Sequence, residues 1–397
     1  MSTLQKHRIA VIVSHPIQHF VPQYKSWSNL DNIELCVFFA SKHGLLPYHD
    51  KNFGREVSWE GMQLDFTHEF LPGADTRAVN KNIDSVDLES KLQSFTPDLV
   101  VVYGYSQRLQ KRAIEWAENN KVPVCMISDA VLRAPKNMIK KFLKPLVLPF
   151  IYKKIDLFFS VGDANEAYYR NYGVKDQQMI RTFFPIDIAY YDKVLKNSEL
   201  VRQQIRKELG IPDDHKVILN VGKLISLKRQ IDLIHLSNSM QNTQKKITII
   251  LAGTGPDEVY LQNQCKNIGV GGMIFAGFVT PNTLVDYYCA ADVYAHCSEY
   301  ENHSLAISEA IYCGKPVVIS DRCGSYGPSD DVRHGLNGFV YTCKDINDLA
   351  QKLNYIFDNP KLEKEMGTKS SQFSRYHQSL AHGEALKQAI SILQMEK

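Results

Sequence analysis

Short apolar runs recur along the first half of the chain, each about the length of a buried strand. The runs are 8–14, 33–40, 97–104, 122–128 and 156–162. Segments with the apolar spacing of an amphipathic helix follow the first and third runs, at 17–29 and 107–120. Nearly continuous apolar strands that alternate with helices are typical of a parallel sheet covered on both faces, so we predict a doubly wound α/β domain.

The same pattern begins again after a charged, helical stretch that ends near Gly210. The new apolar runs are 216–222, 247–252, 274–278 and 316–320. A chain of 397 residues has room for two such units, since a single domain commonly holds roughly 150 residues. We therefore predict an α/β protein with two Rossmann-like domains.

Composition excludes several classes of function. Lys and Arg number 46 against 43 Asp and Glu, and a net charge of +3 is too balanced to indicate a nucleic-acid partner. The 8 cysteines form no C-x-x-C pair, which argues against a zinc site. The first residues lack a secretory leader pattern, and no apolar run reaches the roughly 20 residues that cross a bilayer. We expect a cytoplasmic protein.

The stretch 297–320 combines a loop, a helix and a strand with two carboxylates. Ser304 is a plausible N-cap whose hydroxyl would accept a hydrogen bond from the helix start, and Gly314 lies just past the helix end. Glu301 falls in the loop and Glu309 in the helix. Free N–H groups and the positive end of the helix dipole favour an anion such as a diphosphate. The stretch therefore predicts a nucleotide-sugar site.

This stretch resembles the signature of the family 4 retaining glycosyltransferases, which have the GT-B fold. Glu301 and Glu309 form E-x7-E, and A-x3-G-x-P-V follows from Ala310. The resemblance implies two Rossmann-like domains that face each other across a cleft. It also implies that Glu301 contacts the donor sugar and that Glu309 contacts the ribose. The implied enzyme is a retaining, metal-independent hexosyltransferase that uses a nucleoside-diphosphate sugar, by default a UDP-sugar, and no cofactor.

Other motifs of the second domain fit the same family. Gly222, Lys223 and Lys228 match G-[RK]-x4-K, and fixed cations there would stabilise a departing diphosphate, so Lys223 and Lys228 join Glu301 as catalytic candidates. The family usually has Phe-Gly or Gly-Phe-Gly after the first Glu, whereas this chain has Asn302 and His303, which leaves the donor sugar open. The expected donor-binding residues are Gly222, Gly253, Gly255, Gly277, Phe278, Asn302, His303, Ser304, Leu305 and Glu309.

The acceptor side is expected to come from the first domain. The loop after the first strand reads SHPIQHF instead of a glycine-rich fingerprint, and this opening resembles a bacterial subset of the family. Because ligands of such folds bind at the carboxyl ends of the strands, His15, Gln18 and His19 are candidates. Asp129 would orient an acceptor hydroxyl, although an Asx turn explains it equally well. Tyr48, Phe53 and Trp59 are further candidates for stacking on a sugar, although aromatic side chains more commonly pack beneath a long loop such as this one.

Residues 135–154 mix lysines with large apolar residues, a composition that suits an anionic membrane surface. The alternative is a helix whose apolar face packs on the domain while its lysines stay in water. Pro145 and Pro149 are expected to break this segment into short pieces. If it contacts lipid, the protein is peripheral at the inner face of the membrane.

The resemblance also sets expectations for domain limits and pathway. FFPID, which ends at Asp187, matches the family's linker, so the first domain is placed at 1–187 and the second at 188–370, with 371–397 as a helix that crosses back. The expected acceptor is a glycan or lipid-linked glycan in surface polysaccharide or glycoconjugate synthesis. Two other interpretations stay open, a nucleotide-sugar 2-epimerase of the GT-B fold and a non-catalytic nucleotide-sugar-binding protein.

Overall fold

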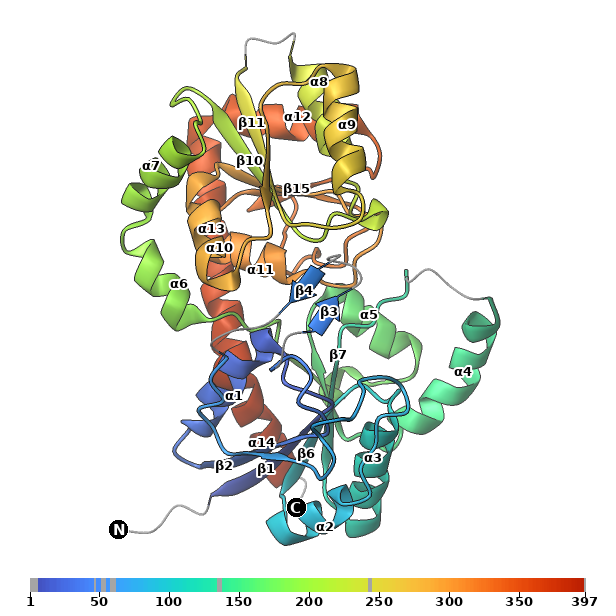
Figure 1. Cartoon of the computed structure of the whole chain (residues 1–397). Helices are drawn as coiled ribbons and strands as arrows, with labels where there is room; N and C mark the ends of the chain where they lie inside the picture. Colours follow the sequence, from blue (N-terminus) through green and yellow to red (C-terminus); the bar gives the residue numbers. More distant parts are fainter. Residues whose placement is uncertain are drawn as a thin grey trace.

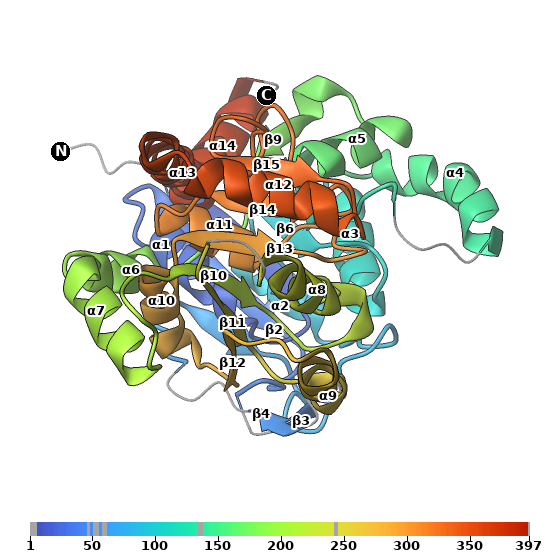
Figure 2. The same ribbon diagram turned by 90° about the horizontal axis from the view of Figure 1, so that it is seen from above.

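The computed structural model describes residues 6–45, 48–50, 55–57, 62–133, 138–241 and 245–395, with the backbone alone for 48–50, 55–57 and 138–142. Within these residues the chain forms two bodies, each built around one parallel sheet (Figure 1). Both sheets are covered by helices on their two faces, as Figure 2 shows for the second body from above. The two sheets confirm the predicted pair of Rossmann-like units.

The strands of both sheets correspond to the apolar runs of the sequence. The first sheet comprises β1 (His7–Val13), β2 (Ile33–Phe39), β5 (His68–Phe70), β6 (Leu99–Tyr103), β7 (Val124–Ser128), β8 (Leu157–Ser160) and β9 (Met179–Arg181). The second comprises β10 (Lys216–Val221), β11 (Ile247–Ala252), β12 (Met273–Gly277), β13 (Val293–His296), β14 (Val317–Ser320) and β15 (Gly338–Tyr341). A separate antiparallel hairpin consists of β3 (Tyr48–Asp50) and β4 (Arg55–Val57).

The helices of the first body are α1 (Val21–Ser28), α2 (Leu88–Phe95), α3 (Arg108–Asn120), α4 (Met138–Tyr152) and α5 (Asp163–Asn171), with short 3₁₀ turns at Gln18–Phe20 and Asp176–Gln178. The second body has α6 (Ile188–Leu195), α7 (Ser198–Glu208), α8 (Ile231–Met240), α9 (Glu258–Ile268), α10 (Pro281–Ala290), α11 (Leu305–Tyr312) and α12 (Ile346–Phe357), with a 3₁₀ turn at Ser226–Lys228. The chain ends with α13 (Pro360–Ser379), a π-helical turn at Leu380–Glu384 and α14 (Ala385–Met395). No described helix has both the length and the apolar character that crossing a membrane requires.

Strand order explains where ligands can bind. The order is β5-β2-β1-β6-β7-β8-β9 in the first sheet and β12-β11-β10-β13-β14-β15 in the second. In each sheet the direction in which successive strands are added therefore reverses between two central strands, β1 and β6 or β10 and β13. The loops at the carboxyl ends of these strands separate there and leave a crevice, which is the usual ligand site of open α/β sheets.

The last two helices join the bodies. In Figure 1 they are the red helices that run from the second body to the first. Helix α13 packs against α11, and the chain bends at Gly383, where the backbone leaves helical geometry. Helix α14 then buries Leu386 and Ile390 in the core beneath the first sheet. The crossing predicted for 371–397 thus involves two helices, of which the first begins earlier, at Pro360.

The linker between the two bodies, at 184–187, is hydrogen-bonded to the helical segment that crosses back between them. The Gln378 side chain is buried; its Nε2 donates to the Phe184 carbonyl and its Oε1 accepts from the Ile186 amide, both at 2.9 Å. Nε2 of His382 lies 2.9 Å from the Ile186 carbonyl. Asp187, our predicted domain limit, caps α6 by accepting from the Tyr190 amide at 3.1 Å. These bonds hold the linker against the crossing helices.

The prediction that Pro145 and Pro149 break the basic segment is wrong. Both prolines lie inside α4, which the structure describes as one helix. Leu148 and Tyr152 are buried in the core of the first body. Their burial stabilises the helix enough to outweigh the hydrogen bonds that the prolines remove, because tertiary packing commonly overrides local propensity.

We predict that Gln378→Leu lowers the free energy of unfolding by about 2–4 kcal/mol, because two buried backbone groups lose their partners. Chemical unfolding followed by circular dichroism measures this. Gln372→Leu is the matched control, since Gln372 is exposed on the same helix. Equal stability of the two variants would show that the bonds to the linker contribute nothing.

Candidate functional site

A cleft of about 690 Å³ lies between the two bodies, at the carboxyl ends of both sheets. From the first body it is lined by the predicted residues His15, Gln18 and His19. From the second body the predicted residues in its lining are Gly222, Lys223, Lys228, Gly253, Phe278, Glu301, His303, Ser304, Leu305 and Glu309. Residues far apart in sequence thus meet in one place. The other four predicted residues, Asp129, Gly255, Gly277 and Asn302, are outside this lining.

Glu301 is the centre of a charged cluster. It follows β13 and forms an ion pair with Lys228, which ends the 3₁₀ turn after β10. Nε2 of His296 lies 3.2 Å from the same carboxylate oxygen. Burial alone would raise the pKa of Glu301, but the hydrogen bond with His296 and the charge of Lys228 outweigh it and lower this pKa to about 2. Glu301 is therefore a fixed anion beside a fixed cation at neutral pH.

His296 is a site residue that was not predicted from the sequence. It is the last residue of β13, and its side chain is fully buried between Tyr294 and Ser298, whose hydroxyls lie 3.0 Å and 2.9 Å from its ring nitrogens. Burial lowers its pKa, so the ring is neutral and orients Glu301 by hydrogen bonding. Its position at the carboxyl end of a central strand is the signal that could have identified it as a candidate.

Glu309 lies on the inner face of α11, deep in the cleft. The Tyr288 hydroxyl donates to its Oε2 at 2.9 Å. Burial raises the pKa of Glu309 to about 7, although hydrogen bonds from Tyr288 and Tyr191 oppose the shift. The two carboxylates of E-x7-E are therefore in different states: Glu301 is fully charged and Glu309 is close to half-protonated at neutral pH.

Gly222 and Gly253 let two loops of the second body touch backbone to backbone. Both have φ of +151°, which side-chain-bearing residues rarely adopt. A Cβ on Gly253 would lie 1.9 Å from the Gly222 carbonyl oxygen. A Cβ on Gly255 would lie 2.3 Å from the Leu224 carbonyl oxygen. The glycines of this turn therefore position the loop that carries Lys223 and Lys228.

Ser304 does not act as the predicted side-chain cap. It occupies the N-cap position of α11, but its hydroxyl makes no capping hydrogen bond. Its amide donates instead to the Ser325 hydroxyl at 2.8 Å, which fixes the loop in an extended conformation. The start of α11 therefore keeps N–H groups that no cap satisfies, facing the cleft beside Leu305.

His303 lines the cleft and belongs to a buried ionic cluster. Its Nε2 is 3.2 Å from Asp330 and 3.5 Å from Asp331. Burial alone would lower the pKa of His303, but the hydrogen bond with Asp330 and the charges of both carboxylates raise it. Asp331 also accepts from the Ser308 hydroxyl at 2.6 Å and contacts His377 at 2.9 Å. These partners indicate an imidazolium held by two carboxylates.

The same three side chains could in principle hold a metal ion, since their ligand atoms lie within 4.8 Å of one another. The carboxylate oxygens are already used, however. Asp330 accepts from the Asp163 amide at 2.6 Å and from the Asp331 amide at 2.8 Å. We therefore interpret the cluster as an ion pair that also joins the two bodies, since Asp163 belongs to the first.

His15 and His19 are electrically neutral at neutral pH. Burial lowers the pKa of each to about 4, and the charge of His43 contributes to the shift of His15. Nδ1 of His15 lies 2.9 Å from the Ser14 hydroxyl, and its ring is 5.4 Å from that of His43. His19 packs against Phe20 and Phe184.

Asn302, Gly277 and Asp129 lie outside the cleft lining. Asn302 accepts from the Tyr300 hydroxyl, and Gly277 accepts from the Gly253 amide at 2.8 Å. Burial raises the pKa of Tyr300, and the nearby charge of Asp129 raises it further. The side chain of Tyr48, and all of Phe53 and Trp59, lie outside the described residues.

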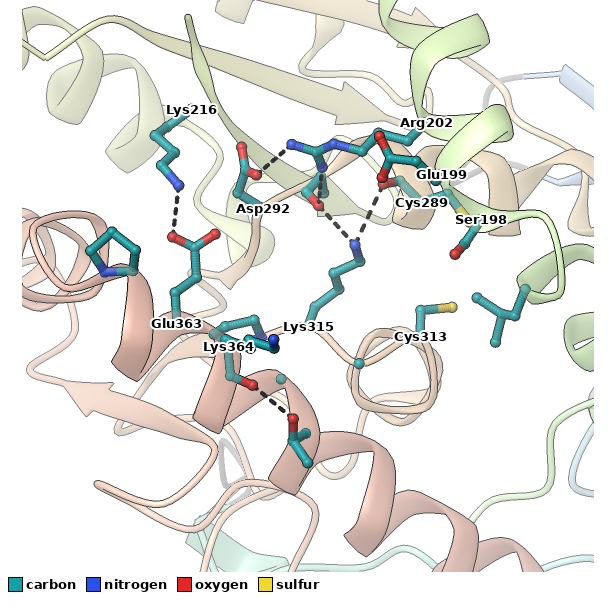
Figure 3. A pocket seen from close by; sticks show the side chains of 17 residues that line it. Ser198, Glu199, Arg202, Lys216, Cys289, Asp292, Cys313, Lys315, Glu363 and Lys364 are labelled. Carbon is teal, nitrogen blue, oxygen red and sulfur yellow. Dashed lines mark hydrogen bonds and ion pairs between the residues drawn. The ribbon is translucent and has the colours of Figure 1, made fainter. Parts of the chain in front are cut away.

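A second cavity, of about 560 Å³, lies at the opposite ends of the second-sheet strands (Figure 3). Three of its cationic side chains have partners within the fold. Arg202 pairs with Asp292 at 2.7 Å and Lys216 with Glu363 at 2.7 Å, while Lys315 donates to the Ala291 carbonyl at 2.8 Å, just past the end of α10. These contacts are structural, and the cavity lining holds none of the predicted site residues.

Comparison with known proteins gives a family and a fold. Residues 201–373 match the family model described as glycosyl transferases group 1. N-acetyl-alpha-D-glucosaminyl L-malate synthase of Bacillus anthracis is 24% identical over 170 residues, which are 43% of this chain and 43% of that protein. D-inositol 3-phosphate glycosyltransferase of Corynebacterium jeikeium is 30% identical over 206 residues, 50% of this chain and 48% of that protein. The matches thus span less than half the length of these relatives.

Solved structures match over nearly the whole chain. A glycosyltransferase from Rickettsia africae superposes with a TM-score of 0.72 at 13% identity, covering 98% of both chains. Anabaena HepE in complex with UDP gives a TM-score of 0.71 at 18% identity, covering 98% of this chain and 100% of that one. These similarities show the GT-B fold.

We predict that Glu309→Gln stabilises the protein in a pH-dependent manner. The pKa of Glu309 is raised from 4.5 to about 7 in the folded state. The unfolded chain therefore loses this proton first, and the wild type loses stability as the pH rises between these values. Glutamine avoids that loss, so the gain should be roughly 2 kcal/mol larger at pH 8 than at pH 5.

Chemical unfolding at the two pH values measures the gain. Glu365→Gln is the control, because Glu365 is exposed on α13 and its replacement should have the same small effect at both pH values. A Glu309→Gln effect that is independent of pH would contradict a carboxyl group half-protonated by burial.

Proposed function

This chain belongs to the glycosyl transferases group 1 family, and we propose that it transfers a sugar from a nucleoside-diphosphate sugar to an acceptor hydroxyl with retention of configuration. One observation carries the proposal: Lys228, Glu301 and Glu309 line one cleft at the strand ends where ligands bind. Lys228 and Glu301 are in contact there, although 73 positions separate them in the sequence. UDP is the proposed nucleotide, and a hexosyl group is the proposed sugar. The proposed acceptor is a glycan or lipid-linked glycan in surface polysaccharide or glycoconjugate synthesis.

The second body would stabilise the diphosphate that leaves in this reaction. When the bond from the sugar to the diphosphate breaks, negative charge develops on the leaving oxygen. Lys228 and Lys223 lie beside the uncapped start of α11, and together these groups would stabilise that charge. Since Lys228 is paired with Glu301 in the free protein, its charge is already positioned and requires little reorganisation.

The acceptor would attack from the side of the first body. Its oxygen forms the new bond to the sugar on the face that the diphosphate leaves, and its proton passes to an oxygen of the departing diphosphate. Glu301 would orient the donor sugar through its ionised carboxylate, and Glu309 would accept hydrogen bonds from the ribose hydroxyls. The transfer needs no further base in this scheme, which distinguishes it from epimerisation.

We expect one class of nucleotide sugar to raise the melting temperature of the purified protein in a screen of UDP-, GDP-, ADP- and TDP-sugars. Glu309→Ala and Lys228→Ala should abolish the shift or reduce it strongly. Lys228→Ala should also lower donor turnover by about 100- to 1000-fold, as the loss of one charge-stabilising group commonly does. Lys246→Ala is the control, since Lys246 is exposed and far from the cleft lining.

No shift with any donor, in a folded protein, would contradict the proposed function. A shift without release of the nucleotide, in the presence of a broad acceptor panel, would favour the non-catalytic alternative. Formation of an epimeric nucleotide sugar would favour the epimerase.

We further propose that α4 rests on an anionic membrane surface. In Figures 1 and 2 this helix lies at the outer edge of the first body. Leu146 and Phe150 are 67% and 69% exposed on it, although Leu148 on the same helix is buried. Lys153 stacks on the Phe150 ring at 5.8 Å. Exposed apolar side chains beside lysines fit the boundary between anionic head groups and acyl chains.

We predict that Leu146→Asp weakens binding to vesicles containing anionic lipid by at least about tenfold, because the variant loses buried apolar area and adds a repelled charge. Co-sedimentation with vesicles measures the binding. Leu200→Asp is the matched control, because Leu200 is 66% exposed on α7 in the other body. Equal binding of both variants would contradict the assignment of α4 to the membrane.

A further inference from the structure

The two walls of the cleft differ in charge. Among the described residues that line it, the Lys and Arg side chains are Lys223 and Lys228, and both come from the second body. The first body contributes imidazole and amide groups from His15, Gln18, His19 and His43, and the linker adds the carboxylate of Asp187. The wall that faces the proposed acceptor therefore offers hydrogen bonds without positive charge.

The neutral state of this wall has a structural cause. His19 is enclosed by Phe20 and Phe184, and burial lowers its pKa to about 4. His15 is buried beside a second imidazole, His43, and its pKa is also about 4. Charging either ring would remove a cation from water, so both stay neutral at physiological pH.

His15 is arranged to bind a hydroxyl group. Its Nδ1 faces the Ser14 hydroxyl at 2.9 Å, which leaves Nε2 as the ring nitrogen available to a ligand. A neutral imidazole or an amide can donate to or accept from a hydroxyl, whereas phosphate and carboxylate are recognised by Arg and Lys. Pro16, Ile17 and Pro22 complete this wall with apolar surface that suits the C–H face of a sugar ring.

We infer that the acceptor end received by this cleft is an uncharged sugar or polyol, oriented by His15 and Gln18, and that ends carrying a phosphate or carboxylate are rejected. The inference rests on the proposed function and names its substrate class. The inferred acceptor is uncharged, and so it differs from the L-malate and the D-inositol 3-phosphate that appear in the names of two relatives. A charged group at this wall would lose its hydration shell and gain no cation in return.

The test uses the full chain with the donor that gives the thermal shift. Release of the nucleotide is measured with matched acceptor pairs: methyl glucoside and glucose 6-phosphate, myo-inositol and myo-inositol 3-phosphate, glycerol and glycerol 3-phosphate, and an array of neutral oligosaccharides with their sialylated counterparts. We expect the neutral member to be used at least about tenfold better in every active pair, because unpaired buried charge is strongly discriminated against.

Charge-swap variants make the test specific to the wall. Gln18→Lys should shift the ratio of kcat/KM by at least about tenfold toward the phosphorylated member, because it supplies the missing cation, while the Kd of the donor stays within about twofold. His15→Lys is the second variant, in case the first fails to fold. Gln93→Lys adds the same charge on the exposed face of α2 and should leave the ratio unchanged.

A wild-type preference for the charged member of any active pair would overturn the inference, and so would an unchanged ratio in both cleft variants. Transfer to no member of the panel, by a protein that binds its donor, also counts against it, because a wall built for bare hydroxyls should use some neutral acceptor. Failure of the proposed function is distinguishable from these results, since the donor would then give no thermal shift.

Discussion

The cleft depends on a polar contact between the two bodies, in which Asp330 and His303 are buried. Asp163 of the first body accepts from the Ser329 amide and hydroxyl, at 2.9 Å and 2.6 Å, and its own amide donates to Asp330 of the second body. Arg181 neutralises Asp163 at 2.7 Å, and His303 does the same for Asp330. Charges buried without such partners would be too costly, so the contact persists only when both bodies supply their halves.

This contact places the cleft wall as well as the bodies. His303 contacts Asp330 on one side and Phe184 of the linker on another. It stands two positions after Glu301, so the loop that presents Glu301 is tied to the interface. The fixed charge of Glu301, the half-protonated Glu309 and the neutral histidines opposite are then brought within one cavity. The protonation states of these groups are determined more by burial and nearby charge than by residue type.

Much of the fold could be predicted from the sequence because parallel strands buried on both faces need long apolar runs. The run before His15 and the run before Gly222 both become central strands, so the residues after them had to reach the crevice. Glu301 follows a central strand in the same way. Local pattern failed where long-range packing decides the outcome: burial of Leu148 keeps α4 intact across its prolines, and the Ser325 hydroxyl, which bonds the Ser304 amide, lies in a loop distant in sequence.

The protonation states of the site residues could not be predicted from the sequence either, because they too depend on long-range contacts. Nothing near Glu309 in sequence shows that Tyr288 covers it, and nothing near His303 shows that Asp330 lies beside it. The pKa of a side chain follows from its neighbours in space, which the turn of each loop determines. The charge difference between the two cleft walls is thus a property of the assembled fold. Since the proposed reaction needs cations only where the diphosphate leaves, an opposite wall without lysine or arginine leaves the acceptor oxygen free of competing electrostatic attraction.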